Sequence, residues 1–139
     1  MSELVRLSFS IDQQLLDKLE TLLDRSGYKN RSEFIRDLVR DRLVQAAWEE
    51  DDVDALGTIM LVYNHDIRNL SDKLTELQHE HHHEILATTH LHVDRHNCAE
   101  MIMVRGKPRI IREIADGLRQ QKGVLHADLL MSALGEHLA

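Results

Sequence analysis

The stretch LVRLSFSI, residues 4–11, decides how this chain begins to fold. Its side chains alternate between apolar and polar, with Val5, Leu7, Phe9 and Ile11 in one set and Arg6, Ser8 and Ser10 in the other. Side chains two positions apart share a face of a strand, so the alternation predicts a strand with one apolar side. A lone strand has unpaired edges. We therefore expect it to pair with the same strand of a second copy.

Two amphipathic helices are predicted directly after this strand. Asp12 is suited to cap the start of the first helix, and Gly27 is suited to end it. Asn30 and Glu33 have the spacing of a capping box, with Asn in place of Ser or Thr, and predict a second helix that ends near Trp48. One strand followed by two helices is best completed by a two-fold dimer, in which two strands pair antiparallel over four helices.

The polar face of the predicted ribbon is the candidate DNA-reading surface. A two-stranded ribbon fits the major groove, where an arginine can read guanine and a hydroxyl can donate or accept a hydrogen bond. Arg6, Ser8 and Ser10 of each copy would point outward for this purpose. The alternative is that these side chains are merely solvated and that residues 30–33 only cap a helix.

The rest of the chain predicts a second domain. We divide the sequence into a DNA-binding domain (1–48), an acidic linker (49–55) and a regulatory domain (56–139). In the last of these, the patterns predict a strand at 56–63, a helix at 67–80, strands at 85–94 and 98–105, a helix that starts with Pro108 and ends before Gly123, and a strand at 124–131. This βαββαβ order is that of the ferredoxin-like, ACT-type fold, so the fold class is α+β.

Charge and hydropathy bear on which partners the protein can bind and on whether it enters a membrane. The net charge of −7 argues at first against nucleic acid, but residues 1–47 hold 8 basic and 8 acidic residues and the remainder carries the whole excess. The acidic remainder suits a cation-binding region. No apolar run approaches the ~18 residues that a membrane span needs, and residues 1–12 lack a signal-peptide pattern. We expect a cytoplasmic protein that does not enter a membrane.

Histidines and the single cysteine predict a metal site. Seven of the ten histidines lie between His79 and His96. Within that region His90 and His92 are two residues apart on a predicted strand, so both can face one ion. Cys98 follows a short reversal and can return to the same place. Two imidazoles and a thiolate exclude magnesium and calcium and favour nickel, copper, zinc or cobalt.

The residues alone leave part of this site open. A fourth donor is needed, and none is obvious within the hairpin. The run at residues 81–83, preceded by His79, is compatible with ligands but also with plain solvation, as is His96. His65, His126 and His137 are expected to be structural or surface groups.

Two stretches resemble one family of regulators. The segment GYKNRSEFIRDLVRDRL after a short alternating strand resembles the ribbon-helix-helix repressors, and QHEHHHEILATTHLHVDRHNC resembles the nickel-responsive regulators of that class. The resemblance covers nearly the whole chain.

The resemblance also implies roles for named residues. It implies that His90, His92 and Cys98 of one chain and His79 of a neighbouring chain hold Ni(II) in a square-planar set. It implies a phosphate clamp at Asn30, Arg31 and Ser32, where the second helix starts. Glu100 is placed to orient a ligand, and Glu33 with Asp37 matches a secondary cation site between the domains.

The function that follows is nickel-dependent repression of transcription, with control of nickel-uptake genes. The expected partners are a palindromic operator in double-stranded DNA and further copies of the chain, in a homotetramer built as a dimer of dimers. The alternatives are an intracellular buffer for nickel, cobalt or copper, a regulator that responds to another late transition metal, and an antitoxin with a disordered C-terminal part. We expect no enzyme, because four protein ligands leave no obvious substrate position.

Overall fold

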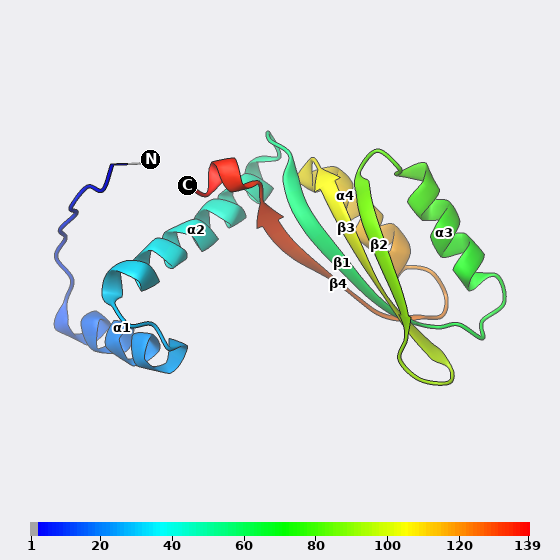
Figure 1. Ribbon diagram of the computed structural model, residues 1–139, viewed down its shortest axis with the longest axis horizontal. Coiled ribbons are helices and arrows are strands. Elements are labelled where there is room, and N and C mark those ends of the chain that lie inside the picture. The colour runs from blue at the N-terminus through cyan, green and yellow to red at the C-terminus, as the bar shows by residue number, and fades with distance from the viewer. Residues whose placement is uncertain (1–2) are drawn as a thin grey trace. The chain divides into compact units, whose positions relative to one another are not determined.

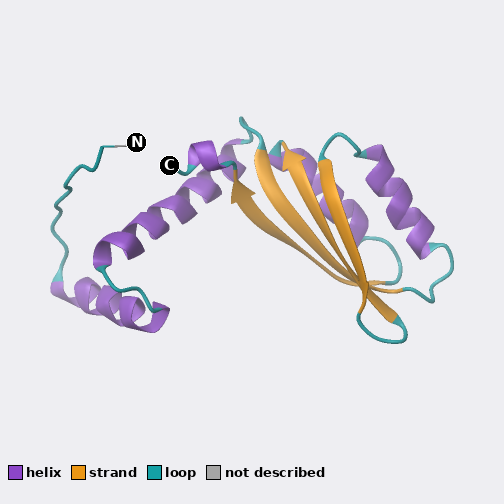
Figure 2. Ribbon diagram, in the orientation of Figure 1, coloured by secondary structure: helices purple, strands orange, loops and turns teal. Residues whose placement is uncertain are grey.

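The computed structural model describes residues 3–139. The chain forms two compact units, Met1–Val39 and Arg40–Ala139 (Figure 1). Figure 2 shows the helices and strands in separate colours.

In the first unit, the segment before the first helix is not part of a sheet. Residues 3–12 lie in neither a helix nor a strand, although a strand is predicted at 4–11. The physical reason is that a strand exists only when it is hydrogen bonded to a second one, and the described residues of one chain offer no partner here. This is the element that the sequence assigns to a pair of chains.

The two helices of this unit begin as their capping residues predict. Helix α1, Gln13–Ser26, starts after Asp12, whose carboxylate accepts a hydrogen bond from the Leu15 N–H at 3.0 Å. It ends at Gly27, which has φ of 73°, a left-handed conformation that glycine adopts without strain. Helix α2, Arg31–Glu50, starts after Asn30, whose side chain accepts from the Glu33 N–H at 2.9 Å.

Helix α2 is two residues longer than predicted, and its second half belongs to the second unit. Trp48 is almost fully buried there, and its indole Nε1–H donates to the Ser132 carbonyl at 2.8 Å. The Arg112 guanidinium lies over the indole ring at 5.4 Å from its centre and also donates to the Trp48 carbonyl. A side chain added at Gly57 of the sheet would contact this ring at 3.4 Å, so the fit is close.

The acidic residues after Trp48 are ordered against the start of another helix. Asp51, at φ 57°, accepts a hydrogen bond from the Arg109 N–H at 2.7 Å. Lys107 donates to the Asp52 carbonyl at 2.6 Å and lies 3.7 Å from the Asp54 carboxylate. An aspartate that accepts from a first-turn N–H caps a helix, so this segment is bonded to helix α4, Pro108–Arg119.

The second unit is built on a four-stranded antiparallel sheet. Its strands are β1, Ala55–Asn64; β2, Ile85–His92; β3, Asn97–Gly106; and β4, Val124–Ala133, in the order β2-β3-β1-β4. Helix α3, Leu70–Glu80, joins β1 to β2, and α4 joins β3 to β4. The predicted βαββαβ order is confirmed. Strands β3 and β1 are the two central strands, and β2 and β4 are the two edge strands.

The two helices cover one face of this sheet. Alternate side chains of β1 and β3 are buried beneath them together with the inner faces of the helices, and this core includes Ile59, Leu61, Leu70, Leu74, Ile102, Val104, Ile111, Ile114 and Leu118. Helix α3 starts at Leu70 rather than at residue 67, because Asn69 adopts φ of 65°, which interrupts the helical path.

Within residues 40–139, no helix lies over the opposite face of the sheet (Figure 1). Met60 of β1 is directly opposite Met101 of β3, and Met103 and Leu130 flank Thr58 in the next row, so an apolar strip crosses three strands. These apolar side chains are 42 to 70% exposed. Among the described residues, no helix has the length and apolar character to cross a membrane.

Candidate functional site

The pairing of β2 with β3 brings the predicted metal donors together. His92 is directly opposite Cys98, and His90 is directly opposite Glu100. Paired residues point to the same side of a sheet, so His90, His92 and Cys98 share the helix-covered face. The two-residue spacing and the short reversal therefore bring the three side chains to one place, and their role as metal ligands stays a prediction.

The donor atoms of these three side chains converge. One ligand atom of each, two imidazole nitrogens and a sulfur, lies within 4.8 Å of the other two. The His92 Nδ1 is 3.3 Å from the Cys98 Sγ, and the two imidazole rings are 5.4 Å apart between centres. Within residues 3–139 this is the one such group of three or more histidine, cysteine or acidic side chains.

The surroundings of Cys98 determine whether its thiol is protonated in the metal-free protein. Cys98 is fully buried, and burial raises the pKa of its thiol; the carboxylates of Glu100, Asp94 and Asp66 raise it further. The thiol therefore keeps its proton near neutral pH and can donate it toward His92. A cation bound here would displace that proton.

Glu100 is buried and lies at the inner end of the site. Burial raises the pKa of its carboxyl, while the hydrogen bond from Gln78 and the charge of His90 lower it. The Gln78 amide, from α3, donates to Glu100 at 3.4 Å and accepts from the Thr88 hydroxyl at 3.1 Å. The amide thus links helix α3 to both strands of the site. The sequence pattern gave no sign of this link.

Two further aromatic rings, those of Tyr63 and His65, lie beside the site, and neither was expected there from the sequence. The Tyr63 ring, opposite Cys98 on β1, is 6.1 Å from that of His90. Its hydroxyl pKa is raised by burial and by Glu100 and Cys98. The His65 ring lies 5.9 Å from the His92 ring, edge to face. Tyr63 follows the β1 alternation toward the site, whereas only the fold places His65 there.

His79 does not join the three donors within one chain. It lies exposed in the last turn of α3, and its carbonyl accepts from the backbone N–H and the ring Nδ1 of His82. The centres of the His82 and His83 rings are 3.9 Å apart, and the two rings are tilted by 40° to each other, in the turn after the helix. His126 and His137 are exposed on β4 and near the C-terminus. The expected fourth ligand is thus available on the surface and separate from the other three.

Similarity to known proteins agrees with this donor set. Residues 56–132 match the family model described as the NikR C terminal nickel binding domain, and residues 5–46 match that of the ribbon-helix-helix proteins of the copG family. The chain belongs to the family of nickel-responsive regulators. Two imidazoles and a thiolate are donors that suit nickel among the late transition metals, so the residues present fit the metal of the family.

Two relatives extend the match to the whole chain. Proteins of Geotalea uraniireducens and of Geobacter metallireducens, each provisionally named a nickel-responsive regulator, are 51% identical over 138 residues, which is 99% of this chain and 99% of each relative. Among solved structures, the uncharacterized protein TM1266 of Thermotoga maritima shares the fold. That match has a TM-score of 0.52 at 16% identity and covers 56% of this chain and 96% of the other.

In this nickel-responsive regulator, the predicted DNA contacts lie in the first unit. Arg6, Ser8 and Ser10 are exposed on the segment before α1. Arg31 and Ser32 are exposed in the first turn of α2, where Arg31 forms an ion pair with Glu20. The Asn30 side chain is engaged as the helix cap. The structure therefore places the six residues at two exposed places, the N-terminal segment and the start of a helix.

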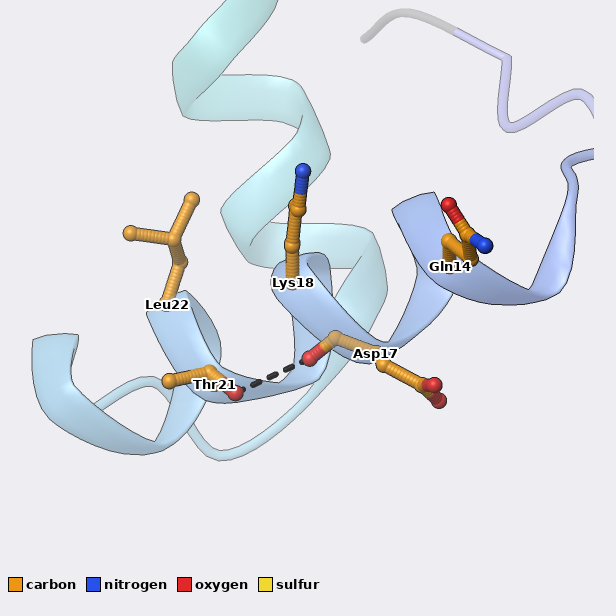
Figure 3. Close-up of a pocket in the computed structure, with 5 residues that line it drawn as sticks. All are labelled: Gln14, Asp17, Lys18, Thr21 and Leu22. Carbon is orange, nitrogen blue, oxygen red and sulfur yellow. Dashed lines mark hydrogen bonds between the residues drawn. The ribbon is translucent and has the colours of Figure 1, made fainter.

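An apolar groove runs along the same unit of the regulator. Phe9, Ile11, Leu15, Leu19, Leu22, Ile35 and Leu38 line it. A shallower hollow on α1 shares Lys18 and Leu22 with this groove and adds Gln14, Asp17 and Thr21 (Figure 3). There the Thr21 hydroxyl donates to the Asp17 carbonyl within the helix, at 2.9 Å. The hollow presents no set of metal ligands among the described residues, whereas the groove presents uncovered apolar surface.

The two carboxylates of the predicted secondary cation site lie on helix α2. Glu33 is exposed, and Asp37 is half-buried one turn along α2. The Asp37 carboxylate accepts a hydrogen bond from the Tyr28 hydroxyl at 2.5 Å. Asp37 is thus already engaged within the first unit, and its part in a cation site stays a prediction.

Proposed function

We propose that this chain is a nickel-dependent repressor of transcription that controls genes for nickel uptake. The observation that carries the proposal is the convergence of His90, His92 and Cys98 in a chain whose residues 5–46 match the ribbon-helix-helix proteins of the copG family. A metal site and a DNA-binding unit in one chain suit a sensor. The cytoplasm, where nickel and DNA are both present, is its proposed location.

The metal is proposed to be held by two subunits. One chain supplies His90, His92 and Cys98, and another supplies His79. The His79 side chain is exposed and is not part of the core of its own chain. A donor from a neighbouring chain completes a four-ligand set that one chain leaves at three. Nickel bound there would supply an attraction between subunits that exists only when they are assembled, and Glu100 would orient the ligands through its buried carboxylate.

The DNA-binding surface is proposed to form when two chains pair. The segment 4–11 of one chain pairs antiparallel with that of another, and the apolar groove of each first unit is covered by the second copy. Arg6, Ser8 and Ser10 then form the outer face of a two-stranded ribbon that reads base edges in the major groove. Residues 30–32 contact the phosphate backbone at a helix start. The two-fold symmetry calls for a palindromic operator.

The uncovered sheet face supports a dimer of dimers. An apolar strip that crosses three strands has the character of a surface that other copies cover. Two such contacts, one through the ribbons and one through the sheets, generate a tetramer with a ribbon at each end. A ligand shifts a conformational equilibrium only by its differential affinity for the states. A ligand set shared between subunits therefore favours the assembly in which both ribbons reach their half-sites.

An intracellular buffer for nickel, cobalt or copper remains the second candidate, because its donor set would be the same. It differs in one property, since a buffer binds metal and has no metal-dependent affinity for DNA. A regulator of the same architecture that responds to another late transition metal is distinguished by the metal that elicits DNA binding. Copper binds such donors more tightly than nickel does, so affinity alone does not decide.

The deciding experiment is a gel shift with a palindromic operator, with and without nickel, for the parent and for His90→Ala. We expect a nickel-dependent shift for the parent, none for His90→Ala, and an unchanged shift for His137→Ala, a control histidine outside the site. The absence of any nickel-dependent shift in the parent would contradict the regulator and favour the buffer. A normal response of His90→Ala would show that the site is wrongly assigned.

The shared ligand set can be tested by mixing subunits. His79→Ala and His90→Ala should each fail to bind nickel tightly. A hybrid oligomer of the two contains some sites that join an intact His79 to an intact His90, and should recover part of the binding. If His79 acts within its own chain, the hybrid contains no intact site and no recovery occurs.

A further inference from the structure

The strand that carries two of the three donors is weakly anchored. β2 lies at the edge of the sheet, and all of its residues after Ile85 are exposed. His90 and His92 are therefore not held by packing in the core. Their positions depend on the ladder to β3 and on the hairpin loop, residues 93–96, which joins the two strands.

The hairpin loop is closed from inside by one carboxylate. Asp94 accepts hydrogen bonds from the backbone N–H groups of His96 and Asn97, at 2.8 and 2.9 Å, and from the Asn97 side chain at 3.0 Å. Val93 N–H donates to the Asn97 carbonyl at 2.9 Å. These bonds shape the loop, but they do not connect it to the rest of the domain.

That connection comes from the segment after β1. The backbone N–H of His65 donates to the His96 carbonyl at 2.9 Å, and the His65 Nε2 lies 2.7 Å from the Arg95 carbonyl. A carbonyl can only accept, so Nε2 carries the proton and donates. The Asp66 carboxylate accepts from the His96 Nδ1 at 2.5 Å. Two consecutive residues thus hold the loop from the side opposite the strand ladder.

We propose, on the basis of the metal centre assigned above, that His65 is a positioning residue of that centre. Its ring lies between the loop carbonyl of Arg95 and the His92 ring, whose centre is 5.9 Å from that of the His65 ring. It therefore restrains the loop whose two ends place His92 and Cys98. The half-buried ring is committed to a carbonyl through Nε2, so its role is to donate a hydrogen bond rather than to bind the metal.

The Asp66–His96 bond acts on the same loop with less effect. Both side chains are more than half exposed, and exposed ion pairs contribute little to stability. The His65 side chain is less exposed, and its ring bond to the Arg95 carbonyl stands beside the backbone bond from the same residue to the His96 carbonyl. We therefore assign the main restraint to His65.

The test compares His65→Phe with His65→Gln in the full-length protein. Phenylalanine keeps a ring and removes the donor, whereas the glutamine amide can still donate to Arg95. Amide hydrogen exchange of the metal-free proteins reports the loop, and titration with Cu(II) or Ni(II), followed by the thiolate-to-metal charge-transfer band, reports the site. His137→Phe is the matched control for a histidine outside the site.

In His65→Phe we expect exchange in residues 93–98 to become roughly five- to tenfold faster, the effect of one net hydrogen bond. We expect metal affinity to fall about tenfold, with a shifted charge-transfer band. His65→Gln should restore both. Unchanged exchange and affinity in His65→Phe would overturn the inference, as would a loss of affinity in both variants with normal exchange, because His65 would then be a ligand.

Different results would disprove the proposed repressor, the metal centre and the role of His65. If the parent shows the charge-transfer band but no metal-dependent DNA binding, the proposed repressor is wrong and the positioning role still stands on the exchange and affinity data. If the parent shows no band at all, the metal centre is wrong and so is the role of His65 in it.

Discussion

The two units of this chain differ in how much of their apolar surface they bury themselves. In the described part of the first unit, only Leu23 and Phe34 among the large apolar side chains are buried, and Val5 and Phe9 are 83 and 60% exposed. The second unit encloses a continuous core between a sheet and two helices. Burial of apolar surface is the main favourable contribution to folding, so we expect the first unit to need a second chain for its stability more than the second unit does.

This difference assigns separate tasks to the two units. A unit that needs a partner chain to fold has a structure that is tied to assembly, which suits a DNA-reading surface whose symmetry must match its operator. A unit with its own core can hold ligands in place in a single chain. Changes in the two units should therefore have separable effects on DNA binding and on metal binding.

The largest effect is expected from Phe9→Asp, which places a charge on the apolar side of residues 4–11. The first unit should lose its dimeric fold and all operator binding, because an unpaired charge in an apolar interface is very costly. Metal binding by the second unit should persist. Circular dichroism, gel shifts and metal titration check the three parts of this expectation.

Ser8→Asp is the matched control for that variant, since it adds the same charge to the neighbouring polar face. It should lose operator binding but keep helical content and oligomeric state. If Phe9→Asp behaves in the same way as Ser8→Asp, the apolar side of this segment is not an interface.

Trp48→Ala tests whether the end of α2 belongs to the second unit. Removing a buried tryptophan costs about 3–5 kcal/mol of unfolding free energy, and the loss should appear in the transition of the second unit in denaturant. Trp48→Phe keeps the apolar ring without the bond to the Ser132 carbonyl and should lose less. A loss confined to the first unit would place α2 wholly with the DNA-binding part.

Met101→Glu tests the uncovered face of the sheet. If the proposed tetramer forms through this face, the variant should be a dimer by analytical ultracentrifugation, while the fold of the second unit is unchanged. Met131→Glu is the control, because Met131 is exposed to the same degree, 41 against 42%, and pairs with Gly57 on the other face. If both variants dissociate alike, the result does not identify the strip on the uncovered face as the contact between dimers.

The smallest effect concerns pH and belongs to the second unit alone. Burial and nearby carboxylates raise the pKa of the Cys98 thiol, so the thiol is protonated in the metal-free protein at neutral pH. Binding as a thiolate releases that proton, and affinity should rise with pH by about tenfold per unit from this group, up to the thiol pKa. Isothermal titration from pH 6 to pH 8 measures the slope.

The same slope should be found for Phe9→Asp if the units are as independent as their cores indicate. Cys98→Ser should show a slope lower by one proton, because a serine hydroxyl does not ionise in this range. A pH-independent affinity of the parent would contradict thiolate ligation.

Much of the second unit could be predicted from local sequence. The apolar block of residues 56–63, the Pro108 start of α4 and the close spacing of His90 and His92 each depend on neighbours in the chain, and the structure has the strand, the helix and the two adjacent imidazoles. The caps at Asp12 and Asn30 are also local, and both are confirmed by their hydrogen bonds. Local patterns therefore fixed the elements and the three converging donors.

What the sequence missed depends on contacts between distant segments. Gln78 reaches Glu100 and Thr88 across the domain, and His65 reaches a loop thirty positions later. Neither residue has a distinctive neighbour in the sequence. The strand at 4–11 is absent for a related reason, since its hydrogen-bond partner would lie in another chain.

The buried indole of Trp48 has a practical consequence. It is the one tryptophan of the sequence, so intrinsic fluorescence of the protein arises from the place where α2 meets the sheet. Its apolar surroundings, the guanidinium over its ring and its bond to the Ser132 carbonyl make its emission a reporter of that junction. An emission change on adding metal would thus record, without any label, whether a signal from the metal centre reaches the helix that leads to the DNA-binding unit.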